Sequence, residues 1–425
     1  MSLPNIRVFI RPAGSFVADG NAVLGSTDLG LLINGGTPFI LGPSSAAFVE
    51  LSDTVTGCSI RRGRTRVTDT FEAGSATVVL VDKDGRFNPD STTSDLYDPI
   101  TSTSYVLPLR QFRIVADIDG DSYELFNGYS NRFTYDYQVG YDPTFVTIEA
   151  VDAFRILNIS TVELLSTTAP GELSGTRISQ ILADLGVPST LRDISAGNTT
   201  LTADDESLRT GLEAIQVIEA TELGAFFMSA SGKYIFRGRQ DTQQLAGGLV
   251  TTPLVFDETS GIPFLAITQS FDDEQIYNKV TVTGSEINDQ EVTDATSVTD
   301  FFLRSLVRSG TLLETDDEGL DMANLLLGSK RRPSLIIDSI GLSVTSLSIP
   351  NQVSVVQAEL LDPITLTKDY AGTALQRTLT IQGVDHTITP NDWSMVLSLA
   401  EPLGGDALIL DSATSGILDS NLVSY

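Results

Sequence analysis

The sequence predicts a mainly β protein with an inserted α/β module, and three observations support this fold class. Charged residues make up only 19% of the 425 positions, and Gly, Ser and Thr are abundant, which is typical of strands joined by many turns. Apolar and polar residues alternate in several runs, among them 106–117 and 393–399. Helical periodicity is clearest at 174–185 and 206–223, in the middle of the chain. A chain of this length is also expected to form more than one domain.

These patterns divide the chain into five predicted parts. They are an extended N-terminal arm at 1–48, a first β domain at 49–160, an α/β module at 161–240, a second β domain at 241–402 and a C-terminal arm at 403–425. The second β domain is expected to contain an inserted helix at 315–328, because Thr315 and Glu318 form the pattern of a capping box. The acidic stretch 286–300 is expected to be a loop.

The C-terminal arm contains a short repeat. Ile-Leu-Asp-Ser occurs at 409–412 and again at 417–420. An apolar extension of this kind favours a strand that pairs with a sheet edge elsewhere. A frayed terminus is the alternative, and the sequence leaves both open.

Composition excludes several classes of protein. No run of about 18 apolar residues exists, so we expect no membrane span. Cys58 is the only cysteine, which excludes an intramolecular disulfide framework and a Cys-rich zinc site. The net charge of −29 disfavours specific nucleic-acid recognition, because binding to phosphates needs clustered Lys and Arg. The acidity therefore indicates a solvated surface, or one past which DNA slides without binding.

The most informative stretch is 61–89, where a basic cluster precedes a strand at 76–81 and a polar turn at 82–85. Gly85 follows Asp84, a pattern typical of a tight turn. The stretch holds no nucleophile, metal cage or phosphate loop, so it favours assembly over catalysis. Four arginines within six positions are too many for a core strand, and carboxylates across a subunit interface would offset their charge. The predicted interface residues are Arg61, Arg62, Arg64 and Arg66.

A second candidate site is Asp117, Asp119 and Asp121, which are spaced by two and interrupted by Gly120. The same spacing begins calcium-binding loops. A complete loop of that kind ends in Glu at position 12, and Gly128 stands there. We therefore favour a plain hairpin turn, with a calcium site as the alternative.

Catalytic constellations are weak. Glu219 and Glu222 could form a carboxylate pair for acid–base work, but 55 acidic residues make such pairs common by chance. His386 is the only histidine, so any Ser–His–Asp set would need it. We expect no enzymatic activity and no cofactor.

Several segments resemble, in the same order, the minor tail or tail hub proteins of long-tailed bacteriophages. They include RGRTRVTDTFEAGSATVVLVDKDGRFNP at 62–89, YNKVTVTG at 277–284 and IQGVDHTITPNDWSMVLSLAEP at 381–402. The most specific part is the ordered set Glu222, Gly224, Gly232 and Arg237 in the α/β module. In this family YNKVTVTG corresponds to the strand that begins the second barrel.

The resemblance implies a fold and a set of partners. Each chain would contribute two tail-tube-like β-barrel domains, one from each predicted β domain, so that a homotrimer mimics a sixfold ring. It would be a structural virion protein at the distal end of the tail and would line the DNA channel. The implied partners are the distal tail ring or tail tube protein, the tape measure protein and a tip or receptor-binding protein.

Two other functions remain as alternatives. The chain could be a distal tail protein or another tail-tip component. A carbohydrate-binding or carbohydrate-active extracellular β protein is the alternative of another class. The single Trp and the aromatic content of 7% do not favour platforms on which sugars stack.

Overall fold

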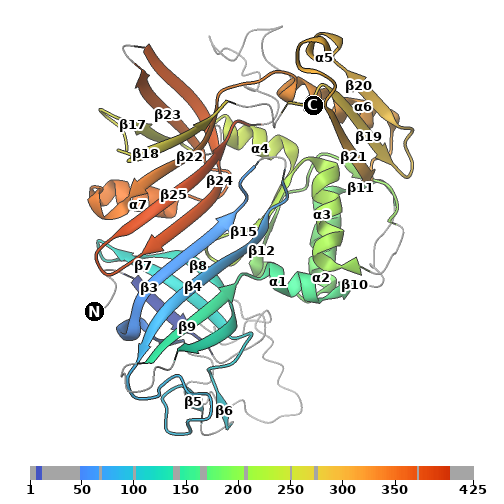
Figure 1. Cartoon of the computed structure of the whole chain (residues 1–425). Helices are drawn as coiled ribbons and strands as arrows, with labels where there is room; N and C mark the ends of the chain where they lie inside the picture. Colours follow the sequence, from blue (N-terminus) through green and yellow to red (C-terminus); the bar gives the residue numbers. More distant parts are fainter. Residues whose placement is uncertain are drawn as a thin grey trace.

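The computed structural model describes residues 6–11, 48–66, 69–98, 102–136, 144–162, 170–204, 209–248, 251–271, 276–370 and 373–402. Strands predominate within these ranges, and 13 of them form one large sheet (Figure 1). The predicted mainly β class is therefore confirmed. No helix in these ranges is long and apolar enough to cross a membrane. Most of the predicted N-terminal arm and all of the C-terminal arm lie outside the described residues.

The first half of the large sheet, here called the first β half, runs in the order β3-β4-β9-β8-β7-β1-β2 with antiparallel neighbours. Its strands are β1 (Ile6–Ile10), β2 (Val49–Glu50), β3 (Val55–Gly63), β4 (Glu72–Asp82), β7 (Gln111–Ile118), β8 (Asp121–Asp136) and β9 (Thr144–Val151). A separate short hairpin consists of β5 (Tyr97–Asp98) and β6 (Thr103–Ser104). Asp119 and Gly120 connect β7 to β8 with φ of 55° and 91°, as a two-residue hairpin turn requires. The predicted hairpin is confirmed.

The second half, here called the second β half, runs in the order β18-β22-β25-β24, with β23 on β24 and β17 on β23. Its strands are β17 (Leu254–Asp257), β18 (Ala266–Ser270), β22 (Ile336–Ser343), β23 (Pro363–Tyr370), β24 (Thr373–Ile388) and β25 (Trp393–Ala400). Helix α7 (Ile349–Gln357) lies between β22 and β23 in the chain and contacts β7 and β8. A helix of the second β half therefore packs on the first.

The two β halves share one sheet because β24 pairs antiparallel with β3. The register places His386 opposite Ile60 and Gly383 opposite Gly63. Gly63 has a φ of 97°, and a Cβ there would lie 2.2 Å from the carbonyl oxygen of Gln382, so only glycine fits this approach. The predicted β domains are thus joined directly by strand pairing. Closure of either half into a barrel stays a prediction.

The α/β module lies beside the first β half and carries the predicted helices. Its elements are α1 (Phe154–Ile159), β10 (Thr161–Val162), β11 (Glu172–Leu173), α2 (Ser174–Asp184), β12 (Arg192–Ile194), β13 (Thr200–Leu201), β14 (Arg209–Thr210), α3 (Gly211–Glu222), β15 (Ala225–Met228), β16 (Tyr234–Arg237) and α4 (Arg239–Ala246). Helix α2 buries Ile178, Ile181 and Leu182, the face that its periodicity predicted. The predicted helices and the 225–237 hairpin are confirmed.

Residues 276–332 form a small subdomain, at the upper right of Figure 1. It contains β19 (Lys279–Gly284), β20 (Gln290–Thr293), α5 (Ala295–Phe301), β21 (Ser305–Thr311) and α6 (Asp316–Lys330). Thr315 caps α6 by accepting from the Glu318 amide, which confirms the inserted helix. Two expectations are wrong. β19 pairs with β20 and β21 instead of beginning the second β half, and 286–300 contains a strand and a helix instead of a loop.

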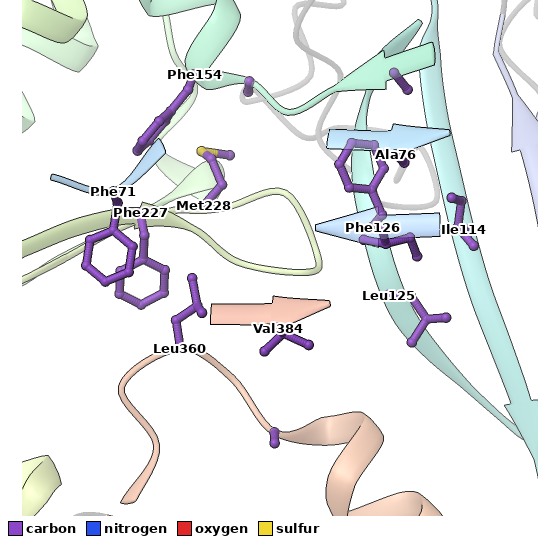
Figure 2. Packing of buried hydrophobic residues seen from close by; sticks show 14 of the residues in the cluster. Phe71, Ala76, Ile114, Leu125, Phe126, Phe154, Phe227, Met228, Leu360 and Val384 are labelled. Carbon is purple, nitrogen blue, oxygen red and sulfur yellow. The ribbon is translucent and has the colours of Figure 1, made fainter. Parts of the chain in front are cut away.

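One hydrophobic core runs through both β halves and the α/β module. Figure 2 shows the rings of Phe71 and Phe227 facing each other, with Leu360 of the second β half beside them. The two ring centroids lie 5.3 Å apart. The small subdomain has a separate core, formed by β19 and α6 and including Val280, Val282, Met322, Ala323 and Leu326. Three parts of the chain therefore share a core, to which the small subdomain adds Leu312, and the small subdomain also has a core of its own.

Candidate functional site

The arginine cluster lies at the end of β3 and just beyond it, where β24 pairs with the strand. Side chains alternate between the faces of a strand, so Arg61 points to solvent and Arg62 into the protein. Arg64 is half-buried and Arg66 is exposed. The structure therefore separates four residues that the sequence groups together.

Arg62 connects three parts of the chain. It is only 5% exposed, and its Nη1 lies 2.6 Å from Oε1 of Glu359, between α7 and β23. The same nitrogen lies 3.5 Å from the Met228 carbonyl oxygen in the α/β module. The other carboxylate oxygen of Glu359 accepts from the Ala230 amide at 2.8 Å. A buried ion pair needs further hydrogen bonds to offset the loss of water from both partners. Glu359 has them from the Ala230 and Leu360 amides, whereas Arg62 Nε is buried without a hydrogen-bond partner among the described residues.

Asp152, the residue after β9, lies near Arg62. It is buried and accepts from the amides of Gly74 at 2.6 Å and Phe154 at 3.0 Å. Burial raises the pKa of Asp152 to about 7, and the hydrogen bonds and Arg62 oppose that rise only in part. The first β half therefore contributes a carboxyl that changes its proton occupancy near neutral pH.

Arg64 lines a cleft where all four parts of the chain meet. Its Nε donates to Gln382 Oε1 at 2.8 Å, its Nη1 donates to the Asp69 carbonyl oxygen at 2.7 Å, and its guanidinium lies 4.2 Å from the Phe71 ring centroid. Burial lowers the pKa of Arg64 to about 10. The residues that line the cleft are Arg64, Asp69, Thr70, Glu219, Ala220, Leu223, Gly224, Thr242, Gln243, Arg308, Leu326, Leu361, Thr380, Gln382 and Pro402.

Glu219 is the buried carboxylate in this cleft, which Asp69 also lines. It is 4% exposed and accepts from the Phe226 amide at 3.0 Å. Burial raises its pKa to about 7, opposed by that hydrogen bond and by Arg64 and Arg308. The described lining of the cleft contains no Ser, Cys or His. Thr70, Thr242 and Thr380 do line it, and we interpret the cleft as a junction because all four parts of the chain contribute to its lining.

Glu222, the other member of the proposed carboxylate pair, is fully buried and occupied by local hydrogen bonds. Its carboxylate accepts from the Ser174 hydroxyl at 2.9 Å and from the amides of Thr199 at 2.8 Å, Asn198 at 3.1 Å and Arg239 at 3.1 Å. These bonds hold two loops against the end of α3. The sequence identified the residue, and the structure places it in a supporting role.

His386 is buried in β24, next to the ion pair. The Trp393 indole Nε1 donates to its Nδ1 at 3.2 Å. Burial lowers the pKa of His386 to about 3, and the nearby Arg62 charge contributes to that shift. The imidazole therefore stays neutral and packs within the sheet, which does not suit the base of a triad.

The calcium candidates lie at the β7–β8 hairpin. Asp117 accepts from the Ser122 hydroxyl at 2.5 Å and lies 3.3 Å from Arg7 Nε, while Asp119 occupies the turn. Within the described ranges, no group of three acidic, His or Cys side chains could hold a metal ion. Local partners and turn geometry account for Asp117, Asp119 and Asp121. Calcium binding here stays the untested alternative to a plain hairpin turn.

The polar turn after β4 is fixed by its own side chains. Asp82 accepts from the amides of Arg86 at 2.9 Å and Phe87 at 3.2 Å. Arg86 Nη2 lies 2.8 Å from Asp95 Oδ2, and Phe87 is 1% exposed in the core. The sequence DGRF therefore encodes a turn that anchors one aromatic ring.

Comparison with known proteins relates this architecture to solved structures. No protein-family model matches the chain, and no curated protein matches it. The tail protein from Neisseria meningitidis superposes with a TM-score of 0.54 at 11% identity, over 84% of this chain and 94% of that one. The 43 kDa tail protein of prophage MuSo2 from Shewanella oneidensis gives 0.51 at 12% identity, over 85% and 97%.

The chain has the fold of phage tail proteins. The resemblance noted in the sequence is thus confirmed at the level of the fold. The likeness includes nearly the whole length of both solved proteins, so it is not confined to one β half or to the α/β module.

Proposed function

We propose that this chain is a structural, non-enzymatic component of a bacteriophage tail and acts as the tail hub at its distal end. The observation that supports this proposal most is the likeness in fold, which covers 94% of the Neisseria meningitidis tail protein and 97% of the prophage MuSo2 tail protein. The site geometry agrees with a structural role, because Arg62, Glu222 and His386 all bind partners within the chain.

The hub proposal includes a homotrimer. Each chain has two β halves in one sheet, so three chains would present six such units to a sixfold tail ring. Arg61 is 62% exposed at its side chain and Arg66 is exposed, and we assign both to the contact with a neighbouring subunit. The proposed partners are the distal tail ring or tail tube protein, the tape measure protein and a tip or receptor-binding protein.

The acidity of the chain fits a surface along which DNA passes. At −29 per chain, a trimer repels phosphates within a Debye length of about 8 Å at physiological salt. We propose that Asp, Glu, Ser and Thr dominate the surface facing the channel. Fluorescence anisotropy with a labelled duplex should detect no binding near physiological salt. Micromolar, salt-sensitive affinity would contradict this part of the proposal.

Mass photometry of the purified protein tests the trimer. A hub should give a species of about three times 45.5 kDa, alone or after addition of its ring partner. A protein that stays monomeric with and without that partner would contradict the hub proposal.

A further inference from the structure

The small subdomain presents three large apolar side chains to solvent. Phe302 is 83% exposed, Leu303 59% and Val307 58%. They lie on β21 and on the segment that leads into it, and among the strands that the structure describes β21 pairs with β19 alone. We call these three residues the apolar knob. Phe302 and Leu303 are adjacent in the chain, and neighbouring exposed apolar side chains of this size are typical of binding surfaces.

The knob is held in a fixed conformation. Phe302 has a φ of 62° and a ψ of 169°, a backbone conformation that is rare for a bulky residue. The fully buried Asn278 maintains it, because its Nδ2 donates to the Phe302 carbonyl oxygen at 2.6 Å and its Oδ1 accepts from the Arg304 amide at 2.8 Å. Strained backbone held by a buried side chain is more common at functional sites than in ordinary loops.

The surroundings of the knob contain several arginines. Arg304 follows Leu303 directly, whereas Arg308 lines the cleft and Asp300 precedes the knob. The end of α6 lies close by, because the Lys330 carbonyl oxygen accepts from the amide of Tyr277, next to Asn278. Arg331 and Arg332 are both exposed at this end. The rim of the knob thus contains Arg304, Arg331 and Arg332, together with Asp300 and with Asp294, which lies 3.7 Å from Arg331 Nη1, in a chain whose net charge is −29.

We propose that the apolar knob is a subunit contact, which docks on the surface of a second copy of this chain. This inference rests on the homotrimer of the proposed function and names one of its interfaces. Charge complementarity favours a second copy as the occupant, because a chain of −29 presents a predominantly acidic surface to the arginine rim. Phe302 then acts as the aromatic anchor at the centre, and the arginines form the polar rim.

The double variant Phe302→Ser/Leu303→Ser tests the contact. Sedimentation over a concentration series should show the dissociation constant of the trimer raised on the order of tenfold or more. The matched control is Leu265→Ser/Ile159→Ser, which removes side chains that are 72% and 59% exposed elsewhere and should leave the trimer unchanged. The melting temperature should be the same for the knob variant and its control, because all four replaced side chains are exposed.

Charge reversal at the rim gives an independent measurement. Arg331→Glu/Arg332→Glu should weaken the trimer and reduce the sensitivity of its dissociation constant to salt. A knob variant that trimerises like the wild type would overturn this inference and leave the trimer intact. If that variant trimerises normally but no longer enters tails, the occupant is another tail protein, which also overturns it. A wild type that never trimerises would contradict the hub proposal itself.

Discussion

Arg62 Nη1 lies 2.6 Å from Glu359 Oε1, although the two residues are 297 positions apart in the chain. The pair joins the first β half to the second, and Glu359 also holds the Ala230 amide of the α/β module. Both residues are largely removed from solvent. One ion pair therefore links three parts of the fold, in addition to the β3–β24 strand pairing and the shared hydrophobic core.

Replacing Arg62 should destabilise the protein strongly. Arg62→Met leaves the Glu359 carboxylate without its cation and should lower the free energy of unfolding by about 3–5 kcal/mol. Arg61→Met, one position along the same strand, removes an exposed cation 4.0 Å from Asp385. It should change the free energy of unfolding by less than about 1 kcal/mol. Urea denaturation of the two variants measures the difference. Equal stabilities would show that the Arg62 pair does not join the parts.

Replacing Glu222 should also destabilise the fold. Glu222→Ala leaves the buried Thr199 amide, two partly buried amides and the Ser174 hydroxyl without their acceptor, at a cost of about 3 kcal/mol. Glu222→Gln keeps one acceptor oxygen and should therefore lose less stability than Glu222→Ala. Glu72→Ala, at an exposed position of β4, is the control and should change stability by less than about 0.5 kcal/mol. Guanidinium denaturation distinguishes these cases.

Stability should fall as pH rises from 6 to 8. The pKa values of Asp152 and Glu219 are about 7 in the folded chain, against ordinary values of 3.8 and 4.5, so the folded state binds more protons in this window than the unfolded state. Their contribution is fully present below the ordinary pKa values and is lost as pH rises through about 7. Thermal melting of wild type and Asp152→Asn/Glu219→Gln at both pH values checks this. The variant should show a smaller pH dependence, and an unchanged dependence would refute the assignment.

Charge reversal at Arg61 and Arg66 tests the predicted subunit contact. Arg61→Glu/Arg66→Glu should raise the dissociation constant of the trimer, because it places negative charge against an acidic neighbour. Lys83→Glu, at an exposed turn position, makes the same kind of change elsewhere and serves as control. Mass photometry at several concentrations compares the three proteins. Equal trimer fractions would place these arginines outside the interface.

Local signals in the sequence predicted the elements that depend on local chemistry. Thr315 and Glu318 marked the start of α6, and Asp119-Gly120 marked the β7–β8 turn, because a cap and a two-residue turn are determined by neighbouring residues. The α/β module was predictable for the same reason.

Long-range pairing was not predictable in this way. Val280 and Val282 on β19 show the alternation of any half-buried strand, and nothing local indicates that they pair with β20 and β21 instead of the large sheet. Glu359, the partner of Arg62, is also far from it in the sequence. The arginine cluster therefore predicted an interface between chains, whereas Arg62 lies at an interface between parts of one chain. In the sequence Asn278 is only one residue of a strand motif. Its hydrogen bond to the Phe302 carbonyl oxygen depends on tertiary contact and has no local signal.

Electron microscopy of tailed particles that carry this protein tests the central proposal most directly. Particles would be labelled with an antibody against the chain, with particles lacking the protein as control. The hub proposal predicts label at the end of the tail distal to the head, with none along the shaft. Label on the head or along the tail, or no label on purified particles, would contradict it.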